Sequence, residues 1–446
     1  YWIGTPLGDV TGLAGLISRN AAQLTAKGGD INLSAGGSIV VREKSSLDVS
    51  GGFYNHEEGA IRTSYLIKDG RLVPIKDATP DQVYDGVFNG QSTFDFTKWG
   101  ISKTYTPPLF TATNSKTYVE GAAGGTLTIN APSMAIAGDL RGATIKGPRQ
   151  PSNPPAAGGL KTTFTAEKPV AVPGSTTINY ISHSPTPPTV TFANRPESIS
   201  IPEFTLVNDA PSALPAGLTQ NVQLSTDLLD EGGFGTLEVN NPDGDIIVPE
   251  NVTLNAGNKG SISFGAANLN IQGNVIAHGG KLSFTTYNLS PSFVSEYQIL
   301  NPSGTVALPT AVAGRGMFLL GDKARLDASG LISDDRAEST TPEGEAIIID
   351  GGEISIRSYS ADLAKGSIID VSGGVHVSDK AARSYGKGGA ITIATGSDPG
   401  FSSLLGGTLK LGSTLSGYSG GTGGSLSIQA GVIEIGTRDL TGALHL

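Results

Sequence analysis

A short glycine-led phrase recurs along this chain of 446 residues and constrains its fold more than any other feature. Each copy has two glycines followed by alternating apolar and polar residues, as in Gly28-Gly29-Asp30-Ile31-Asn32-Leu33. Further copies begin at Gly124, Gly279, Gly351, Gly388, Gly406 and Gly423. The alternation is the pattern of a half-buried β-strand. Recurrence of one short unit is typical of a solenoid, in which turns stack because one turn cannot bury its own apolar face.

A second phrase, Asp-x-Ser-Gly, starts at Asp48, Asp327 and Asp370. Asp and Ser can hydrogen-bond to their own backbone in tight turns, and glycine adopts the positive φ angles that corners require. Comparable phrases stand about 17 to 25 residues apart, the length expected for a coil of three short strands and three turns. At about 20 residues a coil, the repetitive part would hold roughly 15 coils. We therefore predict an all-β parallel β-helix (β-solenoid) with extra-helical insertions.

An array of antiparallel β-sandwiches is the alternative fold. It would place hairpin signals such as Asn-Gly between paired strands, and Asn89-Gly90 and Asn130-Ala131 fit that role poorly. A helical apolar stripe is weak and confined to residues 14–24.

Interruptions of the repeat predict the domain organisation. Residues 53–119 are rich in Tyr, Phe, Asp and Lys, whereas residues 148–215 hold 13 of the 26 prolines. Because proline cannot donate to a central strand ladder, the second interruption is expected to lie outside the coils, with candidate edge strands at 176–180 and 189–192. The expected division is β-helix coils at 1–52, an ordered insertion at 53–119, coils at 120–147, a proline-rich extra-helical insertion at 148–215, coils at 216–330, a charged loop at 331–350 and coils at 351–446.

Composition excludes several classes of protein. The chain has no cysteine, so it holds no disulfide and no thiolate metal site. The net charge of −10 disfavours nucleic acid and anionic lipid as partners, and the scattered basic residues show no nucleic-acid footprint. No apolar run is long enough to span a membrane. The first residues, Tyr1-Trp2-Ile3-Gly4, lack the features of a signal peptide, so a mature product or an interior piece of a longer protein is expected.

Two common catalytic patterns are weak here. Gly417-Tyr418-Ser419-Gly420-Gly421 matches the nucleophile elbow Gly-x-Ser-x-Gly, which needs a strand-turn-helix context, and no helix is expected after it. The five histidines stand apart without the spacing of a helical zinc site. They are His56, His183, His278, His376 and His445.

The carboxylates leave more than one interpretation open. Turn formation is the first role expected of Asp48, Asp327 and Asp370, and Ca²⁺ binding at the corners is the alternative. Asp243-Gly244-Asp245 with Glu250 lacks the EF-hand arrangement. A glycosidase would need two carboxyl groups a few Å apart, and Asp334 with Asp335, in a charged stretch that also holds Arg336 and Glu338, is the candidate pair.

The chain resembles the large filamentous-haemagglutinin-type exoproteins. The segments that carry the resemblance are Gly51-Gly52-Phe53-Tyr54, Arg71-Leu72-Val73-Pro74-Ile75, Lys98-Trp99-Gly100-Ile101, Tyr118-Val119-Glu120-Gly121 and Gly147-Pro148-Arg149-Gln150. The resemblance implies a right-handed β-helix in a bacterial exoprotein that crosses the outer membrane by two-partner secretion, through an outer-membrane transporter. Such proteins stand on the cell surface and serve adhesion, aggregation and biofilm formation. The family's N-terminal secretion domain is not visible, so the chain would be an interior segment.

The expected function is therefore that of an extracellular structural or adhesive protein without enzymatic activity or cofactor. Its expected partners are a host-cell or neighbouring-cell surface or glycan, or further copies docked end to end through open strand edges. The alternative is a polysaccharide-acting β-helix enzyme, a lyase or glycoside hydrolase. Tyr54, Tyr84 and Trp99 are expected to form the small core of the insertion, and a sugar-binding platform is their alternative role.

Overall fold

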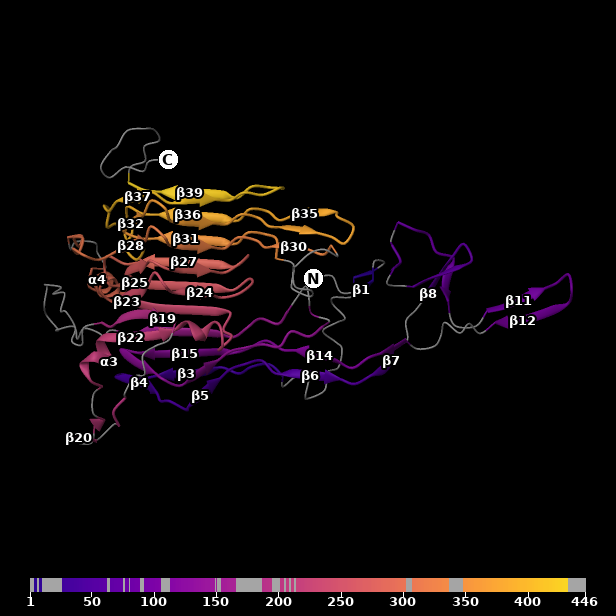
Figure 1. Cartoon of the computed structure of the whole chain (residues 1–446), viewed down its shortest axis with the longest axis horizontal. Coiled ribbons are helices and arrows are strands. Elements are labelled where there is room, and N and C mark those ends of the chain that lie inside the picture. Colours follow the sequence, from indigo (N-terminus) through magenta and orange to yellow (C-terminus); the bar gives the residue numbers. More distant parts are fainter. Residues whose placement is uncertain are drawn as a thin grey trace. The chain divides into compact units, whose positions relative to one another are not determined.

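The structure is a computed structural model of the chain (Figure 1). It describes residues 4–5, 8–9, 26–61, 65–74, 77–79, 81–88, 92–105, 113–148, 150, 154–165, 187–194, 201–203, 206–207, 210–211, 214–301, 307–336 and 348–431. The expected weak helix at 14–24 and the expected strand at 176–180 lie outside these residues. The described part is mostly β-structure with one large parallel sheet, as predicted for an all-β chain.

The large sheet is organised around a stack of nine parallel strands, here called ladder A. In spatial order its members are β3 (Ile31–Ser34), β15 (Thr126–Ala131), β18 (Gly159–Phe164), the first half of β23 (Thr236–Val248), the first half of β25 (Ser261–Ile271), β27 (Lys281–Thr286), β31 (Glu353–Arg357), β36 (Ala390–Ala394) and β39 (Ser425–Gln429). Figure 1 shows the last four lying one above another. Parallel pairing throughout contradicts the antiparallel sandwich alternative.

Two further stacks of parallel strands accompany ladder A. Ladder B contains β22 (Asn221–Ser225), β19 (Thr189–Ala193), the second halves of β23 and β25, β28 (Met317–Leu320), β32 (Ser360–Leu363) and β37 (Leu409–Leu411). Ladder C contains β24 (Thr253–Asn255), β26 (Asn274–Ile276), β29 (Arg325–Asp327), β33 (Ile368–Asp370) and β38 (Thr414–Ser416). Two separate parallel pairs are β4 (Ser38–Val41) with β16 (Ser133–Ile136), and β5 (Ser46–Asp48) with β17 (Asp139–Arg141).

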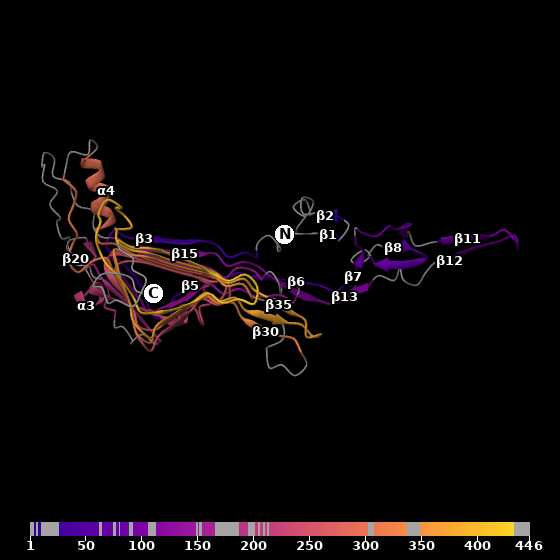
Figure 2. The same ribbon diagram turned by 90° about the horizontal axis from the view of Figure 1, so that it is seen from above.

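From β25 onward the chain visits ladders A, B and C in that order, and Figure 2 shows strands of successive layers superimposed. The predicted spacing holds for only some layers. Leu237 pairs with Ile262 and Ile262 pairs with Leu282, both at sequence intervals within the predicted range, but the next partner in the column, Ile354, follows Leu282 only after a long excursion of the chain. Because segments leave the ladders between layers, ladder A has nine strands in the described part instead of roughly 15 coils.

The Gly406-Gly407 phrase is also not equivalent to the others. It precedes β37, which pairs with β32 in ladder B, whereas the phrases at Gly388 and Gly423 precede strands of ladder A. The short interval from the Gly388 phrase to the Gly406 phrase, and the next one to the Gly423 phrase, therefore each connect a strand of ladder A with a strand of ladder B. The repeat of ladder A at this point runs from Ala390 to its partner Ser425 and spans both short intervals together.

Most of the paired glycines are required by close backbone approach between layers. A Cβ on Gly389 would lie 1.9 Å from the carbonyl oxygen of Gly352, and one on Gly352 would lie 2.0 Å from that of Gly280. Those carbonyls accept ladder hydrogen bonds, for example from Ala390 to Gly352 at 3.0 Å. Positive φ, the predicted reason for glycine at the turns, is therefore not the reason for glycine in most of these phrases. Gly279, Gly406 and Gly407 have positive φ, whereas the other described glycines of the Gly-Gly phrases do not.

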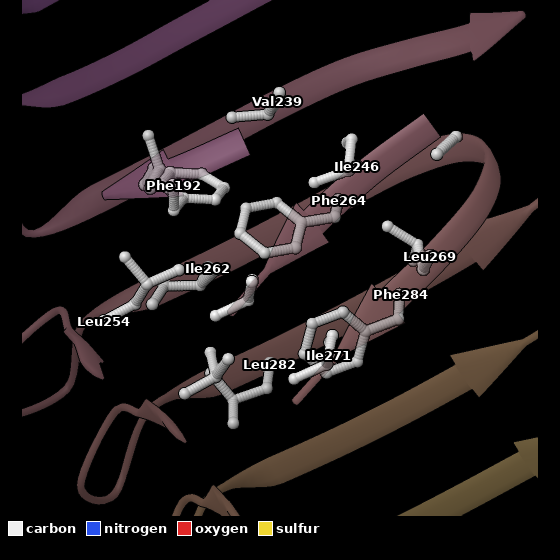
Figure 3. Packing of buried hydrophobic residues seen from close by; sticks show 14 of the residues in the cluster. Phe192, Val239, Ile246, Leu254, Ile262, Phe264, Leu269, Ile271, Leu282 and Phe284 are labelled. Atoms are coloured by element: carbon white, nitrogen blue, oxygen red, sulfur yellow. The ribbon is translucent and has the colours of Figure 1, made fainter. Parts of the chain in front are cut away.

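The core consists of apolar side chains from all three ladders. Leu237, Ile262, Leu282 and Ile354 share one register position of ladder A and are almost completely buried. Phenylalanines of ladders A and B also pack together in the core. Ring centroids lie 5.3 Å apart for Phe192 and Phe264 and 5.9 Å for Phe264 and Phe284 (Figure 3). The centroids of Phe284 and Phe318 lie 5.5 Å apart. Since one layer supplies only a few of these side chains, each layer depends on its neighbours for burial.

The proline-rich stretch contributes to the ladders, contrary to prediction. β18 and β19 lie within residues 148–215, and each has parallel partners on both sides. Neither strand contains a proline, because the 13 prolines of this stretch all fall outside 159–164 and 189–193. Proline therefore marks the segments that enter and leave the ladders. Elements around these segments include β20 (Leu206–Val207), β21 (Ala210–Pro211), α3 (Ala216–Gln220) and the 3₁₀ helix η3 (Thr226–Leu228).

The chain divides into two compact units. The ladders belong to the larger unit, together with α4 (Pro291–Leu300) and the small sheet of β30 (Ile332–Asp334), β34 (Val375–Val377) and β35 (Arg383–Tyr385). The smaller unit comprises residues 1–26, 53–120 and 147–149. Its strands are β1 (Gly4–Thr5), β2 (Gly8–Asp9), β6 (Phe53–His56), β7 (Gly59–Ile61), β8 (Tyr65–Lys68), β9 (Arg71–Pro74), β10 (Gly86–Phe88), β11 (Ser92–Phe96), β12 (Ile101–Tyr105) and β13 (Thr113–Ser115), with β14 (Tyr118–Gly121) paired to β6.

Substitution of Gly389 by alanine should destabilise the chain, because the new Cβ would overlap the Gly352 carbonyl. We expect the free energy of unfolding to fall by about 1–3 kcal/mol, the usual cost of overpacking a tight interior. Gly29→Ala is the matched control, since Gly29 is also the second glycine of its phrase and a Cβ there meets nothing within 4 Å. Urea denaturation followed by circular dichroism measures both; equal effects would contradict the close-approach explanation.

Candidate functional site: ladder corners, an acidic groove and exposed loops

The three Asp-x-Ser-Gly phrases form corners of one kind. The backbone N–H of Ser50 donates to Asp48 Oδ1 at 2.8 Å, and the equivalent bonds from Ser329 to Asp327 and from Ser372 to Asp370 are each 2.9 Å. The carbonyl of the residue after each Asp accepts a bond from the second glycine of the next ladder A phrase. These bonds run from Gly125 to Val49 (2.8 Å), from Gly352 to Ala328 (2.7 Å) and from Gly389 to Val371 (2.7 Å). The two sequence phrases therefore meet at one corner.

Asp327 and Asp370 are stacked partners in ladder C, and one arginine bridges them. Arg325 donates from Nε to Asp327 Oδ2 at 2.8 Å and from Nη2 to Asp370 Oδ2 at 3.0 Å. Burial raises the pKa of Asp327, but hydrogen bonds from Ser329 and the Arg325 charge outweigh it, and the pKa lies below its usual value. The single guanidinium offsets part of the negative charge of the two stacked carboxylates, and each carboxylate serves as a structural hydrogen-bond acceptor.

The other residues singled out from sequence form separate pairs and not one cluster. Arg336 holds Asp334 through both carboxylate oxygens and lowers its pKa to about 2, so Asp334 is ionised at neutral pH and cannot donate a proton. Asp335 contacts His376 Nε2 at 2.8 Å. Asp243 pairs with Arg315, Asp245 accepts from Asn268, and Glu250 pairs with Lys323, so these three carboxylates face different partners. Glu338 lies outside the described residues.

Each described histidine lies near a carboxylate in a different part of the chain. His56 Nε2 lies 2.8 Å from Glu120, and its ring stacks on Tyr118 at 4.4 Å. His278 Nδ1 lies 3.1 Å from the Ser329 carbonyl and 3.9 Å from Asp327. His183 and His445 lie outside the described residues. Within the described part of the chain, no three His, Asp or Glu side chains are grouped as a metal site.

The Gly417–Gly421 motif lies in the turn between β38 and β39. The Ser419 hydroxyl donates to the carbonyl of Gly386, and a strand, not a helix, follows the motif. The hydroxyl therefore ties two turns together instead of standing exposed above a sheet.

The three aromatic residues of the insertion do not form one core. Tyr54 packs edge-on against His56 at 4.7 Å, and the Tyr84 hydroxyl accepts from the backbone of Thr79 at 2.8 Å. Trp99 lies in a hairpin turn and is 67% exposed, so its predicted place in a core is wrong.

An acidic groove lies beside β17, between that strand and the turn that follows η3. Gly142, directly after β17, donates to the Gly232 carbonyl of this turn at 2.7 Å. A hollow of about 670 Å³ opens between them. Its charged lining residues are Glu43, Asp48, Asp139, Arg141, Asp227 and Glu231. With five carboxylates and one guanidinium, the groove favours cationic or hydroxyl-rich ligands over anions.

Asp48, which lines the groove, and Asp230, which does not, have pKa values shifted in opposite directions. Hydrogen bonds from Ser50 lower the pKa of Asp48, whereas burial and the neighbouring Asp227 charge raise the pKa of Asp230, which precedes the lining Glu231. Opposite shifts are the property that separates a general base from a general acid. Sequence reasoning missed this groove because its residues come from three distant segments, and only Asp48 stood in a recognisable phrase.

Buried polar side chains hold loops beside ladder B. Asp398 accepts backbone N–H bonds from Asn288, Leu289, Gly400 and Phe401 at 2.6–3.1 Å. Asn288 in turn donates to the carbonyls of Val312 and Arg315. The loops around α4 are therefore fixed on the ladders, which is how a rigid scaffold presents a surface.

Comparison of the chain with known protein families, curated proteins and solved structures finds no match. In the described part of the chain, no helix is both long enough and apolar enough to cross a bilayer.

Replacing Asp327 with asparagine should show how much the ionised Asp327 carboxylate contributes to the free energy of unfolding. We expect a loss of about 1–3 kcal/mol in the free energy of unfolding at neutral pH, because a buried hydrogen-bonded charge is removed next to Arg325. Because the pKa of Asp327 is lower in the folded chain than the unfolded value of 3.8, the ionised carboxylate stabilises the folded chain above pH 3.8. This stabilisation is lost as the pH falls through the lower pKa of the folded chain. The difference between wild type and Asp327→Asn should therefore shrink below pH 3.8. A difference independent of pH, in urea titrations, would contradict the ionised corner.

Proposed function

We propose that the chain is a segment of a secreted bacterial cell-surface protein whose rod-like scaffold serves adhesion, aggregation or filament formation. The observation that carries the proposal is ladder A, in which nine parallel strands continue in one sheet while long segments leave between them. Such a framework supplies stiffness and length, and the departing segments supply contact surfaces.

We propose further that the three ladders form a right-handed parallel β-helix. The repeated order of ladders A, B and C from β25 to β39 supports a coil of three strands. Crossover connections between parallel strands are nearly always right-handed, because of strand twist. The apolar columns inside and the polar side chains on the alternate positions of β25 and β27 fit such a coil.

The resemblance to filamentous-haemagglutinin-type exoproteins supports an extracellular location and secretion by a two-partner route, with an outer-membrane transporter as a transient partner. A host-cell surface, a neighbouring cell, a surface glycan or a further copy of the chain would be the lasting partner. The net charge of −10 disfavours nucleic acid. The corner carboxylates already accept backbone and arginine bonds, which favours a scaffold without cofactor over one that depends on Ca²⁺.

Immunogold electron microscopy of cells that secrete the protein tests this function. We expect label on rods or filaments at the cell surface, because stacked layers rise by about 4.8 Å each and build elongated bodies. Adhesion should be measured in parallel, by the binding of the purified, fluorescently labelled chain to the same cells. Label confined to the cytoplasm, or compact particles without surface binding, would overturn the proposal.

The acidic groove favours one second candidate, a polysaccharide-acting enzyme. Glycoside cleavage uses two carboxyl groups, one of which has a raised pKa. The groove is lined by carboxylates, and the pKa values of Asp48 and the nearby Asp230 are shifted in opposite directions.

A saccharide screen distinguishes the two functions. On the scaffold proposal, the wild-type chain releases neither reducing ends nor unsaturated products from neutral or acidic polysaccharides. Cleavage that is abolished in Asp227→Asn would establish the enzyme instead. The matched control is Asp362→Asn, whose carboxylate pairs with Lys410 on ladder B, away from the groove.

A further inference from the structure

The β11–β12 hairpin of the smaller unit has two chemically different faces. Antiparallel register places Phe94 opposite Lys103 and Phe96 opposite Ile101, so these four side chains share one face. The other face carries polar pairs: Thr93 and Thr104 are hydrogen-bonded at 2.9 Å, and Ser102 donates to Asp95. A short ribbon of this kind has no second layer of its own that could bury its apolar face.

The apolar face is exposed to an unusual degree. Phe94 is 55% exposed, Phe96 40% and Ile101 58%. The turn adds Trp99, whose ring lies 6.3 Å from that of Phe96, and Gly100 completes the turn with φ +62°. Four of the sixteen large apolar side chains exposed in the described part of the chain therefore lie between Phe94 and Ile101. Clusters of this kind mark interaction surfaces, whereas single exposed apolar residues do not.

Positive charge accompanies this face in an otherwise acidic chain. Lys98 lies in the turn, with Nζ 5.6 Å from the centre of the Trp99 ring, and register puts Lys103 on the aromatic face. The single carboxylate between residues 93 and 104, Asp95, is on the opposite face. The chain as a whole carries a net charge of −10, so the hairpin, with two lysines and one aspartate between residues 93 and 104, has the opposite local charge.

We propose that the β11–β12 hairpin is a membrane-contact element that inserts its aromatic face into the headgroup region of an anionic lipid bilayer. Tryptophan and phenylalanine with adjacent lysine are the combination that binds at bilayer interfaces, since the rings enter the acyl boundary while the ammonium groups remain among phosphates. A glycan would require hydrogen-bonding side chains around the rings, and the residues between Phe94 and Lys103 that accompany the rings on this face or in the turn are mainly apolar or cationic. The inference goes beyond the proposed scaffold function and does not depend on it.

Vesicle binding by the full chain tests this inference. The probes are vesicles of phosphatidylcholine alone and vesicles in which phosphatidylglycerol replaces part of the phosphatidylcholine. The chain has two tryptophans, Trp2 and Trp99, so a Trp2→Phe background makes the emission report Trp99 alone. We expect co-sedimentation with the anionic vesicles, weaker binding to the neutral ones and a blue shift of Trp99 emission on binding.

Paired variants separate the two faces of the hairpin. Phe96→Ala with Trp99→Ala should weaken binding at least tenfold, because the inserted apolar area is lost. Thr93→Ala with Thr104→Ala alters the polar face of the same ribbon and should leave affinity within about twofold. Lys98→Gln should weaken binding about fivefold at low salt while the apolar face stays intact.

Several results would overturn the inference. These are absence of wild-type binding to either vesicle, equal binding by the Phe96/Trp99 variant, and equal loss in the Thr93/Thr104 variant. Self-association that the Phe96/Trp99 variant abolishes, without vesicle binding, would show that a second copy of the chain covers this face instead.

Discussion

The ladders depend on a close approach of backbone to backbone at one corner. There the N–H of the second glycine of a Gly-Gly phrase donates to the carbonyl that follows a corner aspartate, as from Gly389 to Val371 at 2.7 Å. The same glycine lies so near the layer before it that a Cβ would come within 1.9 Å of the Gly352 carbonyl. Glycine is therefore required at this position because a side chain would not fit between the layers. The aspartate stabilises the turn that brings the carbonyl into position.

Close approach at this corner, seen for Gly125, Gly352 and Gly389, accompanies a constant register between the strands. Apolar side chains then fall into columns, from Leu237 through Ile262 and Leu282 to Ile354, and each layer completes the burial of the next. The length of chain between two layers matters little for this packing, since loop closure becomes only slowly more costly with length. The short step from Ile262 to Leu282 and the much longer one from Leu282 to Ile354 therefore coexist in one ladder.

Charge is distributed unevenly over this framework. The corner carboxylates of Asp327 and Asp370 accept bonds from backbone donors and from Arg325, whereas the corner Asp48 belongs to the groove beside β17, where five carboxylates surround a hollow with Arg141 as their cation. The β11–β12 hairpin has the reverse character, with lysines beside exposed rings. The acidic groove and the lysine-bearing hairpin both lie where the chain departs from the regular ladders. A regular ladder by itself provides neither of these features.

Three features could be predicted from the sequence alone. Local alternation predicts the strands, recurrence of the Gly-Gly phrase predicts their parallel stacking, and local hydrogen bonding predicts the corner role of Asp48, Asp327 and Asp370. The sequence could not reveal that Gly406-Gly407 belongs to another ladder, that β18 and β19 lie within the sheet, or that Glu43, Asp139 and Asp227 line one groove. Those facts depend on which distant segments become neighbours. Pairing between strands far apart in the sequence is decided by the packing of whole layers, and no local pattern encodes it.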